Sequence, residues 1–113
     1  RFSMNESETI EEEVYHFGET TFCYNNNELR TRSSRVLITS RQADILRLLA
    51  KNIGNVVSKE MIQEAVWGTV SYANSLAVNV QMTYLRHALQ HDATVKIESL
   101  KKKGYVLTLL SEV

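Results

Sequence analysis

The chain has 113 residues, of which 43% are hydrophobic and 23% charged, so we expect one small globular domain with a single core. Its formal net charge is zero, but five acids lie within residues 1–13, and residues 14–113 carry twelve bases against eight acids. A net charge of +4 over residues 14–113 is compatible with nucleic acid as a partner. No apolar run approaches the roughly 18 residues that a membrane helix needs.

Two further features of the sequence concern its single cysteine and its N-terminus. Cys23 is the only cysteine, which excludes an intrachain disulfide, favours a reducing compartment and predicts a small buried side chain. The Arg-Phe-Ser that precedes Met4 is typical of a tag remnant, so we expect Met4 to be the natural start.

The N-terminal part predicts a tail followed by a sheet. Residues 1–13 are acidic and unpatterned, and we expect a disordered tail or tag remnant there, with the folded domain over residues 14–113. Four short runs rich in aromatic and β-branched residues then alternate with Gly and Asn turn signals. They predict an antiparallel meander with strands over residues 14–17, 20–24, 28–32 and 35–38.

Two helices should follow the sheet. Thr39 and Gln42 have the T-x-x-Q spacing of a capping box, so a first helix should start there and end within residues 52–55. Ser58 can cap a second helix, which Gly68 should end after Trp67. A polar loop over residues 69–74 should connect it to a third helix.

The third helix is predicted over residues 75–90, with Asn74 or Ser75 as its N-cap. One narrow stripe at helical spacing should pack on the core, and it consists of Val78, Met82, Leu85 and Leu89. The opposite side carries a mixed set instead of a mat of Lys and Glu: Leu76, Val80, Thr83, Tyr84 and His87, flanked by Gln81 and Arg86. We therefore expect a partner other than water on that side.

The C-terminal part predicts a basic hairpin, with strands over residues 95–98 and 105–110 around the turn 99–104. Two helices joined by a short loop, with such a hairpin behind them, predict an α+β winged helix-turn-helix fold: a four-stranded antiparallel sheet, three helices and a β-hairpin wing. The lysines Lys101–Lys103 could be a solvated turn, as charge runs usually are. Beside an exposed helix, we expect them to reach the minor groove or the phosphates.

Enzyme chemistry finds little support in the sequence. His87 and His91 are spaced i, i+4, but no Cys or carboxylate completes a metal site with them or with His16. A Gly-rich phosphate loop and a nucleophile elbow are both missing. We therefore expect no catalytic residues, no metal and no cofactor.

Several spaced motifs resemble the effector domain of OmpR/PhoB-type transcriptional regulators. They are Leu37-Ile38-Thr39 before a helix, VSKEMIQEAVWG over residues 57–68, the apolar spacing of residues 78–89, and IESLKKKGY over residues 97–105. The resemblance covers roughly residues 14–110. The wing motif is most similar to the ToxR and CadC branch, whose members carry this domain at the N-terminus, a transmembrane helix after it, and no receiver. A start at Met4 would leave no room for a receiver.

The resemblance implies where DNA contacts should lie. Gln81, Thr83, Tyr84 and Arg86 would make major-groove and phosphate contacts, and Lys101, Lys102 and Lys103 would form the minor-groove wing. To these the mixed face and the predicted cap add Ser75, Val80 and His87. The resemblance also implies that RNA polymerase contacts the loop Thr69, Val70, Ser71, Tyr72, Ala73 and Asn74.

This sequence departs from the family pattern in one respect. Recognition helices of the family usually carry two or three Arg or Lys, whereas this one has only Arg86. We expect a low affinity for a single site, so that useful binding needs a homodimer, tandem copies or tethering.

The resulting hypothesis is sequence-specific binding of promoter DNA by a bacterial transcription regulator. We expect a cytoplasmic domain, of an inner-membrane protein if the ToxR-like assignment holds, with any membrane attachment through a segment outside this chain. The alternative is a protein-interaction module that uses Leu76, Val80 and Tyr84 on the same fold. A receiver-linked response regulator would share the DNA function.

Overall fold

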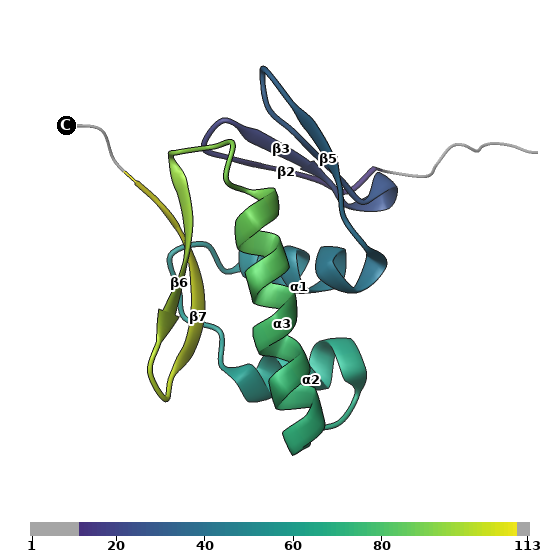
Figure 1. The fold of residues 1–113 in the computed structure, drawn as a ribbon, viewed down its shortest axis with the longest axis vertical. Coiled ribbons are helices and arrows are strands. Elements are labelled where there is room, and N and C mark those ends of the chain that lie inside the picture. The colour runs from purple at the N-terminus through teal and green to yellow at the C-terminus, as the bar shows by residue number, and fades with distance from the viewer. Residues whose placement is uncertain (1–11, 111–113) are drawn as a thin grey trace, which may run out of the picture.

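The computed structural model of the protein describes residues 12–110, which form an N-terminal sheet, three helices and a C-terminal hairpin (Figure 1). The predicted α+β winged helix-turn-helix architecture is confirmed, including the order of its elements. None of the helices described within residues 12–110 is long and apolar enough to cross a membrane. Most of the predicted tail, residues 1–11, lies outside the described residues.

The four strands of the sheet are antiparallel and follow one another in space as they do in the chain. Their bounds are β2 Val14–Phe17, β3 Thr20–Cys23, β4 Glu28–Arg30 and β5 Arg35–Leu37. A 3₁₀ turn, η1 (Tyr24–Asn26), ends β3 one residue earlier than predicted, and Asn27 has the positive φ of 53° that an Asn turn favours. Because β3 alternates buried and half-buried residues, Phe22 faces the core and Cys23 does not, so the prediction of a buried Cys23 is wrong.

The first two helices begin where the capping residues predict. In α1 (Ser40–Lys51) the Gln42 amide donates to Thr39 Oγ1, and the Gln42 side chain accepts from the Thr39 amide, which completes the predicted capping box. In α2 (Lys59–Trp67) Ser58 Oγ accepts from the Met61 amide, and Gly68 ends the helix with a left-handed φ of 84°.

The third helix, α3 (Tyr72–Ala88), begins three residues earlier than predicted. Its N-cap is Ser71, whose hydroxyl accepts from the Asn74 amide, so the predicted cap at Asn74 or Ser75 is wrong. Asn74 is not free to cap because its side-chain amide donates to the carbonyl and the hydroxyl of Thr69. The predicted stripe of Val78, Met82, Leu85 and Leu89 is buried, as expected.

The hairpin consists of β6 (Val95–Leu100) and β7 (Gly104–Leu109), and it is longer than predicted because Leu100 pairs with Gly104. Only Lys101–Lys103 remain in the turn. Val57, which leads into α2, pairs with Tyr105 through two backbone hydrogen bonds, of 2.8 and 2.9 Å. In Figure 1 the hairpin runs alongside α3, and the sheet covers the C-terminal end of that helix.

Asp92, between α3 and β6, joins the hairpin to the sheet. This residue is 2% exposed. Its carboxylate accepts hydrogen bonds from the amide of Glu19, the hydroxyl of Thr20, and both the amide and the hydroxyl of Thr94. Burial alone would raise the pKa of Asp92, but these hydrogen bonds lower it below its ordinary value. The charged carboxylate therefore fixes the β2–β3 turn against the start of the wing.

Glu13 is bonded to the folded domain, although the predicted boundary placed it in the tail. Its amide donates to Asn25 Oδ1 at 2.6 Å, and its carboxylate accepts from Arg47 Nε at 2.7 Å and from the Tyr15 hydroxyl. The Tyr15 and Arg47 hydrogen bonds lower the pKa of Glu13. This contact fastens the start of β2 to α1.

Candidate nucleic-acid interface

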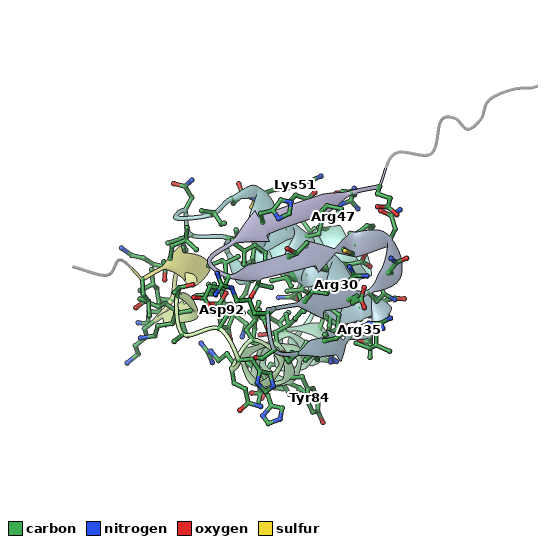
Figure 2. All side chains as sticks on the ribbon, turned by 90° about the horizontal axis from the view of Figure 1, so that it is seen from above. Arg30, Arg35, Arg47, Lys51, Tyr84 and Asp92 are labelled. Carbon is green, nitrogen blue, oxygen red and sulfur yellow. The ribbon has the colours of Figure 1, made fainter. Side chains whose placement is uncertain are left out.

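The outward side of α3 is the mixed surface that the sequence predicted. Leu76, Val80 and Tyr84 are 46%, 50% and 56% exposed, and Thr83 and His87 are exposed beside them. In Figure 2 Tyr84 lies at the edge of the molecule opposite the edge that carries Arg47 and Lys51. The core takes only the inner stripe of α3, so its outer side is available to a partner.

Two predicted contact residues on the flanks of α3 are already bonded within the domain. Gln81 is half-buried, and its Oε1 accepts a hydrogen bond of 3.0 Å from Gln42 of α1. Arg86 donates from Nε to the carbonyl of Ile97 in β6 at 3.1 Å. Both side chains therefore orient the helix against its neighbours.

The guanidinium carbon of Arg86 lies 5.8 Å from the centroid of the Tyr105 ring in β7. A closer pair of the same kind, at 4.4 Å, is formed by Arg47 and the Tyr24 ring. Arg86 thus lies between α3 and the wing, stacked loosely on a wing residue. Arg86 is nevertheless an exposed residue.

The wing tip carries three exposed lysines, Lys101, Lys102 and Lys103. Lys102 has a positive φ of 65°, and Gly104 has a φ of 140°, so the chain reverses direction sharply at the tip. A cavity of about 260 Å³ separates the tip from the start of α2 and from α3, and Lys59, Asn79 and the tip residues line it. The turn of the hairpin therefore lies at the same end of the molecule as the first half of α3 (Figure 1).

Sequence reasoning missed two residues of this region, Asn79 and Lys59. Asn79 is exposed on the flank of α3 that faces the wing, and its Oδ1 accepts a hydrogen bond of 2.9 Å from the Tyr105 hydroxyl. The helical period places Asn79 beside the mixed face, which was the available signal. Lys59 is the first residue of α2 and lines the cavity, but nothing local in the sequence indicates that the wing lies next to it.

The remaining predicted residues are divided between a helix and a short loop. Ser75 is half-buried in the second turn of α3, and its amide donates to the Ser71 carbonyl. Of the predicted loop over residues 69–74, only Thr69, Val70 and Ser71 lie outside α3. The other three, Tyr72, Ala73 and Asn74, form the first turn of the helix.

Three arginines of the sheet and of α1 are paired with carboxylates. Arg30 and Arg35 flank the buried carboxylate of Glu28 on the sheet (Figure 2), and both form ion pairs with it. Arg47 pairs with Glu13 on α1. Because these guanidinium groups already have carboxylate partners, the wing lysines are the better candidates for phosphate contacts.

Comparison with known proteins gives a consistent result. The family described as transcriptional regulatory protein, C terminal, matches residues 33–107. The response regulator ArlR of Staphylococcus aureus is 32% identical over 81 residues, which cover 71% of this chain and 37% of that protein. The chain spans less than half the length of the first curated relatives that it matches.

Solved structures with the same fold include two DNA-binding domains. The DNA-binding domain of E. coli CadC has a TM-score of 0.75 and 23% identity, over 88% of this chain and 95% of that one. The Klebsiella pneumoniae RstA DNA-binding domain, solved in complex with the RstA box, has a TM-score of 0.72 and 23% identity, over 84% of this chain and 96% of that one. At these identities the likeness shows the fold.

Proposed function

The chain belongs to the family of C-terminal domains of transcriptional regulatory proteins, the OmpR/PhoB-type winged helix domains that bind promoter DNA in bacteria, and from this premise we propose how it contacts the duplex. The outward side of α3 enters the major groove. Lys101, Lys102 and Lys103 lie along the phosphates or in the adjacent minor groove.

One observation carries this proposal: Asn79, which precedes the exposed Val80 in α3, and the three lysines of the wing tip line the same cavity. The major groove is wide enough for an α-helix, and a neighbouring cationic turn can then neutralise the backbone. On this account Val80, Thr83 and Tyr84 face base edges, and Ser75, Gln81, Arg86 and His87 lie at the borders of the contact.

A single domain has few cations with which to hold the duplex. Within α3, Arg86 is the only Arg or Lys, and its Nε is bonded to the Ile97 carbonyl. We therefore propose that useful affinity needs two or more copies on tandem half-sites, as a homodimer or as neighbours on DNA, or tethering by another part of the protein.

We also propose a setting for the full protein. The wing motif of residues 97–105 supports a ToxR- or CadC-like regulator, with this domain in the cytoplasm and a membrane anchor in a segment outside this sequence. The likeness to the response regulator ArlR supports the other arrangement, a receiver-linked regulator. In both, the exposed residues Thr69, Val70 and Ser71 and the first turn of α3 would be available to RNA polymerase. The complete open reading frame would distinguish a receiver from a membrane anchor.

A second candidate function is protein interaction through the same helix. The observation that favours it is the exposure of Leu76, Val80 and Tyr84, which are larger apolar groups than a solvated helix usually presents. The lysine tip, which lines one cavity with Asn79 of the same helix, argues for DNA, because an apolar protein partner would leave three ammonium groups without a role.

A comparison of wild type with Tyr84→Ala separates the two candidates. Both proteins would be titrated against duplex DNA by gel shift, and their size would be measured by light scattering. DNA binding that is weakened by the substitution, with an unchanged size, would support the proposed function. A wild-type protein that binds no duplex, and whose self-association is lost in Tyr84→Ala, would support the alternative.

A further inference from the structure

A single row of apolar side chains runs along the outward side of α3. Tyr72, Leu76, Val80 and Tyr84 follow one another at intervals of four residues and are 80%, 46%, 50% and 56% exposed. Four residues advance a helix by about 6 Å, so the row forms a continuous ridge along the side that is proposed to enter the major groove. We call these four residues the apolar ridge.

The polar side chains next to the ridge are engaged within the domain. Asn79 Oδ1 accepts from Tyr105, and Gln81 Oε1 accepts from Gln42. An Asn or Gln needs both its oxygen and its nitrogen to read adenine through two hydrogen bonds, so neither residue is free to do so as it lies.

Arg86, the only Arg or Lys of α3, is held toward the hairpin by the hydrogen bond from its Nε to the Ile97 carbonyl. The Thr83 hydroxyl donates to the carbonyl of Asn79 within the helix. Guanine is most often recognised by two parallel hydrogen bonds from one Arg or Lys. The middle of α3 therefore presents hydrocarbon where a base-reading cation usually stands.

The chemistry of base edges then selects a partner for the ridge. In the major groove thymine offers a methyl group, whereas guanine and cytosine offer acceptors and a donor. An apolar side chain that covers a G·C edge removes water from those groups and replaces none of their hydrogen bonds. A thymine methyl packed against the same side chain gains from burial.

From this, and resting on the proposed function, we propose that Leu76 and Val80 determine specificity by packing against the C5-methyl groups of thymines, so that the half-site carries A·T pairs under the middle of α3. The lysine tip fits the same ligand, because it lines one cavity with Asn79, the residue before Val80, and supplies cations that can neutralise phosphates. The occupant of the ridge is therefore B-form DNA with thymines at the points of contact.

Removal of the methyl groups tests this directly. The wild-type chain would select its preferred duplex from a random pool at low salt, and each thymine of that duplex would then be replaced in turn by deoxyuridine, which lacks only the methyl. Burial of one methyl corresponds to about a fourfold change in affinity. We expect such a loss at one or more positions, measured by fluorescence anisotropy.

The variants Leu76→Ala and Val80→Ala assign the effect to the ridge. Both residues are about half exposed, so the variants should fold, which circular dichroism would check. In the variant that has lost the contact, the deoxyuridine duplex and the thymine duplex should bind equally. As a further control, the sensitive T·A pair would be replaced by C·G in one duplex and by 5-methylcytosine·G in another. The duplex with 5-methylcytosine should bind more tightly, because the two differ only in the methyl group.

The outcomes separate this inference from the proposed function. If the chain binds a duplex specifically but no deoxyuridine substitution weakens the binding, the inference is overturned and the proposed function stands. The same conclusion follows if binding to the selected site depends on guanine N7. A wild-type chain that binds no duplex, or that buries the ridge in a self-associated state, would overturn both.

Discussion

The hydroxyl of Tyr105 in the wing donates a hydrogen bond of 2.9 Å to Asn79 Oδ1 in α3. Tyr105 is 6% exposed and also pairs with Val57 through its backbone, so one residue fixes the wing to α3 and to the segment before α2. The relative position of the two proposed DNA-contacting elements is therefore set by a contact between residues 26 positions apart.

Loss of this hydrogen bond should affect binding more than folding. Tyr105→Phe keeps the ring and removes the hydroxyl, so we expect the free energy of unfolding to fall by about 1 kcal/mol. Affinity for duplex DNA should also fall, because the wing and α3 lose one of the contacts that hold them together, although the bond from Arg86 to the Ile97 carbonyl remains. Urea denaturation and anisotropy titrations would measure the two effects. Unchanged affinity would show that the wing is positioned by other contacts.

Gly104 allows the close approach of the wing to the chain before α2. A Cβ at this position would overlap the Val57 carbonyl oxygen and lie 2.8 Å from Ser58 Cα, and the φ of 140° is unfavourable for any other residue. We expect Gly104→Ala to lower the free energy of unfolding by about 3 kcal/mol or more.

Gly54→Ala is a matched control for this substitution. Gly54 also has a positive φ, of 81°, but a Cβ there would meet nothing within 4 Å. Gly54→Ala should lower the free energy of unfolding by the backbone strain alone, about 1 kcal/mol. Equal losses in the two variants, measured by thermal or urea denaturation, would contradict the close-approach argument.

Asp92 should make the free energy of unfolding depend on pH. Its pKa is lower in the folded chain than its ordinary value, because its hydrogen bonds outweigh the effect of burial. The carboxylate therefore stabilises the fold at neutral pH, and this contribution should decline as the pH falls below about 5 and vanish below the folded-state pKa. The comparison of interest is the free energy of unfolding of wild type and Asp92→Asn between pH 7 and pH 2.

We expect Asp92→Asn to be less stable than wild type by about 2 kcal/mol at pH 7 and the two proteins to converge in acid. A difference that stays constant with pH would mean that the charge of Asp92 does not stabilise the fold.

The lysine tip should contribute to the salt dependence of DNA binding. Lys102→Ala should weaken binding to all duplex sequences and reduce the slope of log affinity against log salt by about 1. Lys96→Ala is the control, because Lys96 lies on β6 of the same hairpin, is exposed, and pairs with Glu98 at 3.5 Å. If both variants keep the wild-type slope, the tip does not contact phosphate.

The sequence predicted the start of a helix correctly where the capping residue and the amides that it bonds lie within one short segment. The capping box of Thr39 and Gln42 and the cap at Ser58 lie within three residues of the amides that they bond, and both helices begin as predicted. The start of α3 was missed because Ser71 and Asn74 are both good caps, and the choice between them depends on the bonds from Asn74 to Thr69.

The exposed side of α3 was predicted from its period, but the state of its polar groups was not. Whether Gln81, Asn79 and Arg86 are free to bind DNA depends on partners in α1, β7 and β6, which lie far away in the sequence. The same holds for Lys59, which lies beside the wing only after the chain has folded. A helical period shows which residues face outward, whereas only tertiary contacts show which of them are already bonded.

The most direct test of the proposed interface is an NMR titration of the uniformly ¹⁵N-labelled chain with a duplex that it binds. We predict that the largest amide shifts fall on the outward side of α3, around Leu76, Val80 and Tyr84, and on the wing tip, Lys101–Lys103. Shifts confined to the N-terminal sheet, around Arg30 and Arg35, with α3 and the wing unaffected, would contradict the account.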